Sequence, residues 1–257
     1  MAETLDIETP AAGVQLVRFN RPDKLNAINE AMRDEIADAF RSLSNDADVH
    51  AVVLTGSGRG FCSGIDIRDF GPGMLEASAP AIERLRFQEA MAGLVRGLAD
   101  LPQPVIAAIN GPCVGAGLAM SLAADIRIAS TAATFGNAAI LLGLSGAEMG
   151  MSYHLPRIVG AGVAADWMLT GRTVSAEEAD RRGLVSRLFE PAELLDQAVE
   201  IACGIAGLTT LGVRLTKRAL QVNIAAAGLG PALELENRNQ VLSHATDDAA
   251  ARRSTWS

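Results

Sequence analysis

Residues 104–118 read Pro-Val-Ile-Ala-Ala-Ile-Asn-Gly-Pro-Cys-Val-Gly-Ala-Gly-Leu and decide the fold class. The apolar run at 104–109 is short and unbroken, which is typical of a strand buried on both faces of a parallel sheet. Turn residues at 110–112 end the run, and the small apolar residues of 118–124 predict a helix. The stretch therefore predicts a buried strand, a glycine-rich turn and a helix, in that order.

The same alternation is found on both sides of this stretch. Residues 14–19 alternate at period two and predict a half-buried strand, and Asn29 is placed to cap an amphipathic helix that follows. The pattern further predicts a buried strand at 51–54, a long helix around 81–99 and a strand at 126–129. Strands that alternate with helices favour an α/β fold with parallel pairing.

The C-terminal quarter has a different pattern. From about residue 191 no strand pattern recurs, and apolar residues continue at helical spacing as far as 242. We therefore predict a core over 1–195 and a helical segment over 196–257, with a frayed end at 249–254. Periodicity leaves open whether the apolar faces of these helices dock on the core or on another subunit.

Composition excludes several classes of protein. The 257-residue chain is 49% hydrophobic and 20% charged, which excludes a disordered chain, a collagen and a coiled coil. Its 30 acidic and 22 basic residues give a formal net charge of −8, the wrong sign for wrapping a polyanion. Aromatic residues make up only 4%, so base stacking is not expected either. Nucleic acid is therefore not an expected partner, whereas local charge can still hold a small anion.

Cysteine usage and the apolar segments indicate the compartment. Cys62, Cys113 and Cys203 are far apart and lack Cys-x-x-Cys spacing, so neither a disulfide framework nor a metal site is expected. The first residues lack a basic segment followed by an apolar run, and no later segment approaches the ~18 apolar residues of a membrane span. We expect a cytoplasmic protein with no membrane partner.

Two glycine-rich segments, 56–66 and 110–118, each join a predicted buried strand to a helix. Such a turn exposes unpaired backbone N–H groups at the positive end of a helix dipole, which can bind phosphate or a developing oxyanion. Tight turns and close helix packing would require the same glycines without any ligand. A dinucleotide fingerprint fits neither segment, because the pattern Gly-x-Gly-x-x-Gly with an acidic residue about twenty positions on is found in neither.

Taken together with their flanking motifs, these two segments are more specific evidence of a protein family than either segment alone. The motifs that occur in order are Arg21-Pro22-Asp23-Lys24-Leu25-Asn26-Ala27, Gly60-Phe61-Cys62-Ser63-Gly64-Ile65-Asp66-Ile67, Asn110-Gly111-Pro112-Cys113-Val114-Gly115-Ala116-Gly117, Phe135-Gly136, Ile140-Leu141-Leu142-Gly143 and Leu169-Thr170-Gly171-Arg172. Over about residues 14 to 190 the chain resembles the crotonase (enoyl-CoA hydratase/isomerase) superfamily. The resemblance implies a spiral of ββα units, a C-terminal helical segment that builds a homotrimer or homohexamer, and a coenzyme A thioester as substrate.

The resemblance also assigns site residues. It implies that the backbone N–H groups of Ile65 and Ala116 bind the thioester oxygen, where enolate or tetrahedral charge develops. The contacts that it implies for the substrate and its coenzyme A moiety are Lys24, Ala27, Ser63, Gly64, Asp66, Ile67, Arg68, Gly115 and Lys217. Structural readings stand beside these: the chain's two lysines can be incidental surface residues, and Asp66 can be a helix-cap carboxylate.

The chain departs from the family at the chemical groups. Hydratases of the family use two glutamates as acid and base, and the matching positions here are Ala119 and Ala139. Downstream, Glu148 falls at or next to the place where related dehalogenases and synthases carry a catalytic aspartate. Glu148 is therefore the candidate base or nucleophile. The spacing Ser145-x-x-Glu148 is equally typical of a capping box that opens a helix.

The sequence thus predicts an acyl-CoA enzyme of enoyl-CoA hydratase/isomerase type, a lyase or isomerase such as those of fatty acid metabolism, with atypical catalytic residues. It is expected to need no cofactor beyond the thioester substrate. The alternatives are a non-catalytic acyl-CoA-binding protein, or a hydrolase or dehalogenase in which Glu148 is the nucleophile. Gly71, Pro72 and Gly73 suggest a lid over the acyl pocket, as a hypothesis.

Overall fold

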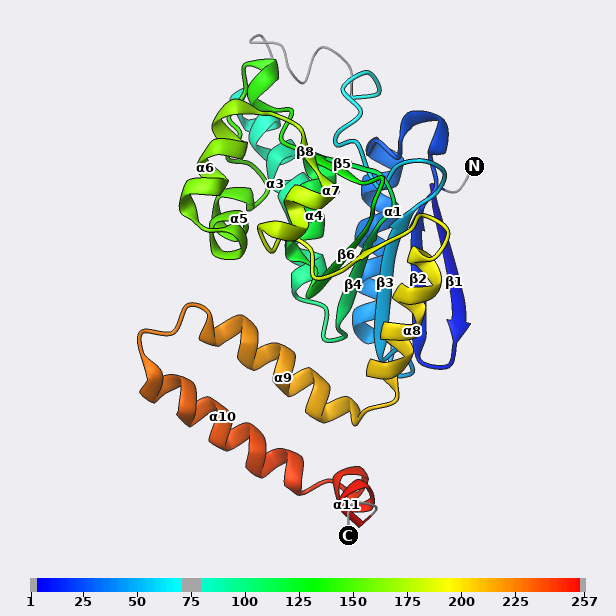
Figure 1. Cartoon of the computed structure of the whole chain (residues 1–257), viewed down its shortest axis with the longest axis vertical. Coiled ribbons are helices and arrows are strands. Elements are labelled where there is room, and N and C mark those ends of the chain that lie inside the picture. The colour runs from blue at the N-terminus through cyan, green and yellow to red at the C-terminus, as the bar shows by residue number, and fades with distance from the viewer. Residues whose placement is uncertain (1–3, 71–79, 255–257) are drawn as a thin grey trace.

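The main sheet of the protein has six strands. The computed structural model describes residues 4–70 and 80–254 (Figure 1). In spatial order the strands are β1 (Leu5–Ala11), β2 (Val14–Phe19), β3 (Ala51–Gly56), β4 (Val105–Ile109), β6 (Ile126–Ser130) and β9 (Leu188–Phe189). All neighbours pair in parallel except β1, which runs antiparallel to β2 along the edge. The predicted α/β class and parallel pairing are confirmed.

A second, smaller sheet lies beside the main one. It consists of β5 (Pro112–Val114), β7 (Thr134–Gly136) and β8 (Val174–Ser175), with β7 in the centre. The chain passes from a main-sheet strand to a small-sheet strand and then to a helix, as in β4, β5 and α4 (Ala116–Ala123). This repeated ββα unit is the spiral that the resemblance implies.

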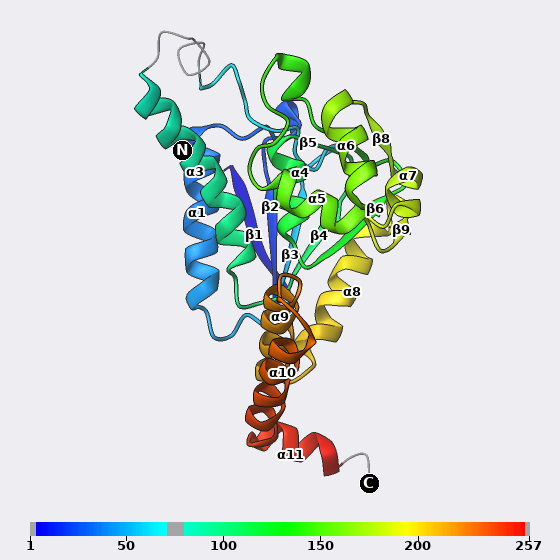
Figure 2. The ribbon, with the colours of Figure 1, turned by 90° about the vertical axis from the view of Figure 1, so that its left-hand side faces the viewer.

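Helices cover both faces of the main sheet. The remaining helices are α1 (Glu30–Asn45), α3 (Ala81–Ala99), α5 (Met151–Val159), α6 (Ala161–Thr170), α7 (Ala176–Arg181), α8 (Leu194–Ala206), α9 (Thr210–Asn223), α10 (Leu229–His244) and α11 (Asp247–Ser254), with short 3-10 turns at Pro22–Lys24 and Ile140–Leu142. The side chain of Asn29 caps α1 by accepting the N–H of Met32 at 3.0 Å, as predicted. Figure 2 shows α1 and α3 on one side of the sheet and α8 on the other.

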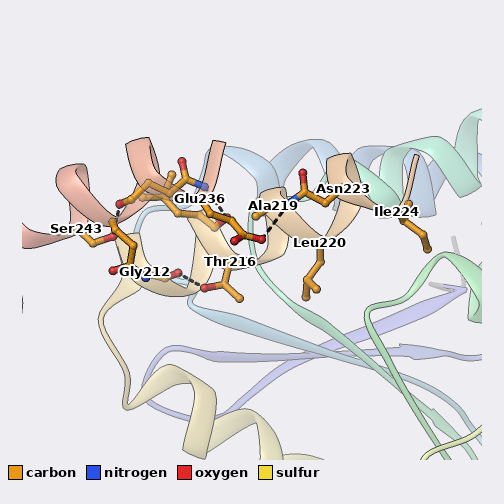
Figure 3. A pocket seen from close by; sticks show the side chains of 11 residues that line it. Gly212, Thr216, Ala219, Leu220, Asn223, Ile224, Glu236 and Ser243 are labelled. Atoms are coloured by element: carbon orange, nitrogen blue, oxygen red, sulfur yellow. Dashed lines mark hydrogen bonds between the residues drawn. The ribbon is translucent and has the colours of Figure 1, made fainter. Parts of the chain in front are cut away.

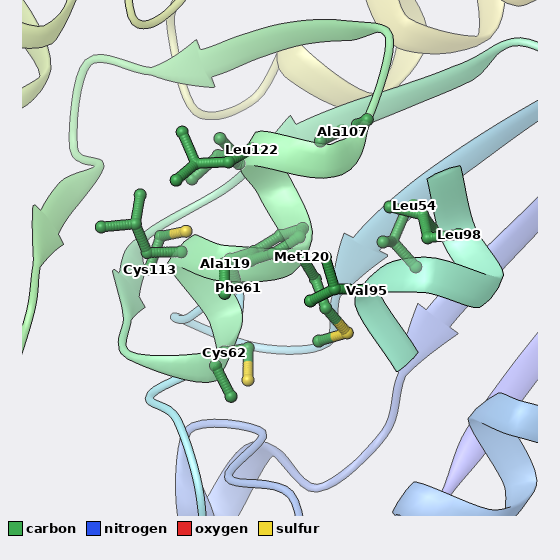
Figure 4. Packing of buried hydrophobic residues seen from close by; sticks show 14 of the residues in the cluster. Leu54, Phe61, Cys62, Val95, Leu98, Ala107, Cys113, Ala119, Met120 and Leu122 are labelled. Carbon is green, nitrogen blue, oxygen red and sulfur yellow. The ribbon is translucent and has the colours of Figure 1, made fainter. Parts of the chain in front are cut away.

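The core follows the alternation of the strands. Along β3, Val52 and Leu54 pack toward α1 and α3, whereas Ala51 and Val53 pack toward α8. Figure 4 shows the inner part of this core, where Ala119 of α4 lies among buried apolar side chains. Burial on both faces explains why the parallel strands are continuous apolar runs.

The C-terminal segment begins later than predicted. Leu194, Ala198 and Ala202 of α8 are buried against the sheet, so α8 belongs to the core and the predicted boundary at 195/196 is misplaced. The helices α9 and α10 project from one end of the molecule as an arm (Figures 1 and 2). The end predicted to fray is instead α11, which carries acidic residues in its first turn and basic residues in its last, the arrangement that suits the helix dipole.

An ion pair with a buried ammonium attaches this arm to the core. The ammonium of Lys217 in α9 donates to the carbonyl of Gln103 at 2.8 Å and to Oδ2 of Asp125 at 2.7 Å. Nearby, the side-chain amide of Gln221 donates to the carbonyl of Ala99 at 2.7 Å. These bonds attach one face of α9 to the loop before β4, to the residue before β6 and to the end of α3.

Within the described ranges, no single helix is long and apolar enough to cross a membrane. The consecutive helices α8 and α9 satisfy that test only as a pair, and they meet at 108°.

We predict that replacing Lys217 by alanine lowers the free energy of unfolding by roughly 1–3 kcal/mol, because the buried carbonyl of Gln103 loses its donor and Asp125 loses its ion-pair partner. Chemical denaturation measures this loss. The chain's other lysine, Lys24, is exposed. Lys24→Ala is therefore the matched control, with an expected change within about 0.5 kcal/mol. Equal stabilities of Lys217→Ala and the wild type would contradict the anchoring role.

Candidate active site

Backbone pairing joins the two glycine-rich turns. Cys62 and Cys113 face one another in an isolated parallel bridge. The N–H of Cys62 donates to the carbonyl of Pro112 at 3.1 Å, and the N–H of Val114 donates to the carbonyl of Cys62 at 2.9 Å. The two turns, about fifty residues apart in the chain, thus run side by side.

A second bridge orients the backbone at Ile65. The N–H of Ile28 donates to the carbonyl of Gly64 at 2.8 Å, and the N–H of Asp66 donates to the carbonyl of Ile28 at 2.8 Å. In a parallel ladder the residue between such a pair directs its own N–H away from the partner strand. The amide of Ile65 therefore faces away from Ile28, and Ile65 lines a cavity.

The amide of Ala116 reaches the same place. Ala116 is the first residue of α4, where N–H groups have no intrahelical acceptor. Gly115 has φ 53° and Gly64 has φ 106°, values that disfavour any residue with a Cβ. A Cβ built on Gly64 would lie 3.8 Å from the amide nitrogen of Ala116. The two glycines thus let the two turns approach closely beside both amides.

The cavity beside these amides has a volume of about 210 Å³. Its lining residues are Ser63, Gly64, Ile65, Ile67, Phe70, Phe87, Gln88, Gly115, Ala116, Ala138, Ala139, Leu142, Leu144 and Glu148. The rings of Phe70 and Phe87 form an edge-to-face pair with centroids 4.8 Å apart. The wall is therefore largely apolar, as suits an acyl group.

Ala119 and Ala139, the positions that the resemblance matched to glutamates, differ in their place in the structure. Ala139 lines the cavity, whereas Ala119 is fully buried in the core and does not line it (Figure 4). Glu148 is the only carboxylate among the described residues that line the cavity. Its Oε1 lies 3.9 Å from the position that a Cβ on Gly115 would occupy, so the carboxylate stands next to the turn that precedes Ala116.

The capping alternative for Glu148 is wrong. The hydroxyl of Ser145 accepts the N–H of Ala147, and α5 begins only at Met151, after Gly150. Within the described part of the chain, the Glu148 carboxylate has no hydrogen bond or ion pair. Desolvation by burial raises the pKa of this carboxyl above its ordinary value.

The other predicted contacts fall into several groups. Ser63, Gly64, Ile67 and Gly115 line the cavity. Lys24 and Arg68 are exposed, and Ala27 is buried. Gly71, Pro72 and Gly73, the hypothetical lid, lie outside the described residues.

Two of the predicted contacts, Asp66 and Lys217, form ion pairs within the chain. The carboxylate of Asp66 is 3.0 Å from the guanidinium of Arg21 and is buried. The ammonium of Lys217 is buried and pairs with Asp125. The ion pair gives Lys217 a structural role within the chain, and its contact with coenzyme A stays a prediction.

The buried thiols are not nucleophiles. Cys62 and Cys113 are fully buried, and desolvation raises the pKa of the Cys62 thiol to about 12. Burial also raises the pKa of Cys113. Both thiols are therefore neutral at physiological pH, and the cysteines are core residues, as their lack of a partner base in the sequence indicated. Among the described residues, no cluster of three or more metal-ligating side chains occurs.

Sequence reasoning missed the aromatic wall and Arg21. Phe70 and Phe87 lie outside the quoted motifs, and their pairing depends on how α3 packs. Arg21 stands inside a quoted motif, but its carboxylate partners follow 45 and 48 residues later, and no local pattern reveals such pairs.

Comparison with known proteins shows the family of the chain. A family model described as Enoyl-CoA hydratase/isomerase matches residues 9–255. The chain belongs to the enoyl-CoA hydratase/isomerase family. EchA12 of Mycobacterium tuberculosis, described as a probable enoyl-CoA hydratase, is 42% identical over 237 residues, 91% of this chain and 83% of that protein.

Two further relatives show the range within this family. The 1,2-epoxyphenylacetyl-CoA isomerase of Escherichia coli is 35% identical over 92% of this chain and 88% of that enzyme. The crystal structure of enoyl-CoA hydratase from Bacillus anthracis superposes with a TM-score of 0.92 at 29% identity, covering 99% of this chain and 96% of that chain. Members with this fold thus carry names of different reactions, so the family alone does not fix the chemistry.

We predict that Glu148→Gln is at least as stable as the wild type at neutral pH. A carboxyl with a raised pKa in the folded state favours folding at low pH, and this contribution is lost as pH rises through the folded pKa. In thermal melts from pH 4 to pH 8, the melting temperature of the variant should therefore rise relative to that of the wild type as pH increases. A variant that is markedly less stable than the wild type at neutral pH would indicate a structural role for Glu148.

Proposed function

We propose that the protein is an acyl-CoA enzyme that isomerises enoyl thioesters through an enolate. The observation that carries this proposal is the carboxylate of Glu148, which has no partner among the described residues and lies in an apolar cavity next to the backbone amides of Ile65 and Ala116. Such preorganised donors stabilise negative charge on a thioester oxygen, and the loss of one donor costs on the order of 10²–10³ in rate.

The proposed reaction moves one proton. The carboxylate of Glu148 removes a proton from the carbon α or γ to the thioester, and the electron pair of that C–H bond moves toward the carbonyl oxygen. The resulting enolate is held by the two amides. Protonated Glu148 then returns the proton to the other carbon, so the double bond shifts and no atom is gained or lost.

The presence of one carboxylate, Glu148, among the described residues of the cavity wall favours isomerisation over hydration. Hydration adds water, and family hydratases divide that task between two glutamates, whose positions here are Ala119 and Ala139. One carboxyl that alternates between base and acid is sufficient for a proton shift, and a raised pKa makes both protonation states accessible. The reaction needs no cofactor besides the thioester.

Exposed basic side chains support binding of the coenzyme A moiety. Lys24 and Arg68 are exposed on the two loops that meet at Ile28 and Ile65. We place the phosphates near these two side chains, with the acyl group in the cavity.

A non-catalytic acyl-CoA-binding protein is the second candidate, because alanine replaces both family glutamates. Binding of acyl-CoA without turnover of any enoyl-CoA or hydroxyacyl-CoA thioester would support that candidate. A third candidate, nucleophilic attack by Glu148, requires a covalent acyl-enzyme, which mass spectrometry would detect.

We predict that Glu148→Gln lowers kcat for enoyl-CoA isomerisation by roughly 10²- to 10⁴-fold with little change in acyl-CoA affinity, because the proton carrier is removed. Steady-state kinetics and calorimetric titration measure the two effects. The matched control is Glu177→Gln, an exposed carboxylate of α7. Unchanged turnover in Glu148→Gln would exclude Glu148 as the base.

We also propose that the arm formed by α9 and α10 joins three or six copies of the chain. Leu220, Ile224, Leu229 and Val241 of this arm are between 60% and 72% exposed. Figure 3 shows the groove between the two helices, where Leu220 and Ile224 extend from α9. Exposed apolar side chains in such number are typical of a surface that is covered in an assembly.

Analytical ultracentrifugation tests the assembly. We expect the mass of a trimer or hexamer for the wild type and a lower mass for Leu220→Glu, since a carboxylate in an apolar interface is unfavourable. A monomeric wild type at micromolar concentration would contradict the proposal.

A further inference from the structure

The side chain of Arg21 bridges two loops without reaching the cavity. Its guanidinium donates from Nη1 to Oδ2 of Asp66 at 3.0 Å and from Nη2 to Oδ2 of Asp69 at 2.7 Å. Nη1 also donates to the carbonyl of Ala27. The side chain is only 14% exposed, so its bonds to Asp66 and Ala27 are largely shielded from water, whereas Asp69 is 43% exposed.

The carboxylate of Asp66 organises the turn that follows Ile65. Oδ1 of Asp66 accepts the N–H of Arg68 at 3.2 Å and that of Asp69 at 3.3 Å. The carbonyl of Asp66 accepts the N–H of Phe70 at 3.2 Å. Asp66 thus fixes a turn that begins directly after Ile65 and carries Ile67 and Phe70 into the cavity wall.

The loop that carries Arg21 is itself held firmly. The N–H of Arg21 donates to the side-chain oxygen of Asn26 at 2.8 Å. The amide nitrogen of that side chain donates to the carbonyls of Ser57 at 2.9 Å and Gly60 at 2.8 Å. Leu25 and Asn26 both adopt positive φ, a conformation that persists only where the surroundings enforce it. The backbone that carries Arg21 is therefore rigidly held, and its guanidinium can orient the loop of Asp66 and Asp69.

The charge state of the bridge is stable. Burial alone would raise the pKa of the Asp66 carboxyl, but hydrogen bonds from Arg21 and from the amides of Asp69 and Arg68 outweigh it and hold the pKa below its ordinary value. Asp66 is thus ionised at neutral pH and pairs with Arg21.

We propose that Arg21 is a positioning residue that sets the direction of the Ile65 N–H and the placing of the Ile67–Phe70 wall through its bonds to Asp66, Asp69 and Ala27. The proposal rests on the proposed function, in which the Ile65 amide binds the thioester oxygen. It predicts that loss of the guanidinium weakens recognition of the thioester carbonyl more than recognition of the coenzyme A moiety. A displacement of about 1 Å at such a donor costs up to 10²-fold in rate.

The test compares butyryl-CoA with S-butyl-CoA, a thioether that lacks the carbonyl oxygen. The ratio of the two dissociation constants isolates the carbonyl contact and requires no turnover. The variants are Arg21→Gln, Arg21→Lys and, as a smaller lesion of the same bridge, Asp69→Asn, whose side chain is 43% exposed. The matched control is Arg33→Gln, because Arg33 is 17% exposed and pairs with Glu30 and Asp34 on α1, away from the cavity.

The wild type and Arg33→Gln are expected to bind the thioester about tenfold more tightly than the thioether, as two hydrogen bonds allow. In Arg21→Gln that preference should largely vanish while S-butyl-CoA affinity stays within about twofold, and Arg21→Lys should restore part of it. Asp69→Asn should show a smaller loss in the same direction, which keeps the test valid if Arg21→Gln does not fold.

Two results would overturn the proposal in distinguishable ways. If the wild type prefers the thioester and the folded Arg21 and Asp69 variants prefer it equally, Arg21 does not position the amide, and the proposed function stands. If the wild type itself shows no preference, the oxyanion site fails and the role of Arg21 fails with it.

Discussion

The pairing of backbone between Cys62 and Cys113 is the contact on which the rest of the site depends. It joins two strand-to-helix turns that the chain forms separately, and it brings the amides of Ile65 and Ala116 to one cavity. The donors are main-chain groups, so the side chains at these two positions are free to be apolar. The requirement falls instead on Gly64 and Gly115, whose positive φ values and close approach exclude larger residues.

The electrostatics of this region agree with that arrangement. A thiolate behind the two turns would oppose negative charge on a thioester oxygen, but burial keeps both thiols protonated. The Arg21–Asp66 pair satisfies its charges internally. Glu148 is then the one carboxylate without a protein partner among the described residues of the cavity wall, and its raised pKa reflects an apolar surrounding rather than a nearby charge. A carboxyl in that state is better suited to proton transfer than to a structural hydrogen bond or ion pair.

Local periodicity was sufficient to predict the parallel strands, the helix capped by Asn29 and the α/β class. It did not reveal the small sheet, because strands such as β8, with two residues, are too short to show a period. Nor did it show that α8 packs on the main sheet, since an amphipathic pattern gives the apolar face of a helix and not the surface that the face meets. The motifs placed the turns of Ile65 and Ala116 correctly beside one cavity. The Ser145-x-x-Glu148 spacing wrongly indicated a capping box, because the chain makes a turn there and α5 begins three residues after Glu148, at Met151.

The central claim is that the two backbone amides polarise the carbonyl of a bound thioester. Isotope-edited infrared spectroscopy of butyryl-CoA labelled with ¹³C at the carbonyl measures this directly. On binding to the wild-type protein, the carbonyl stretch should move to lower wavenumber than in water, and it should stay there in Glu148→Gln, since that variant keeps both amides. A stretch that is unchanged or moves to higher wavenumber would show that the amides do not bind the thioester oxygen.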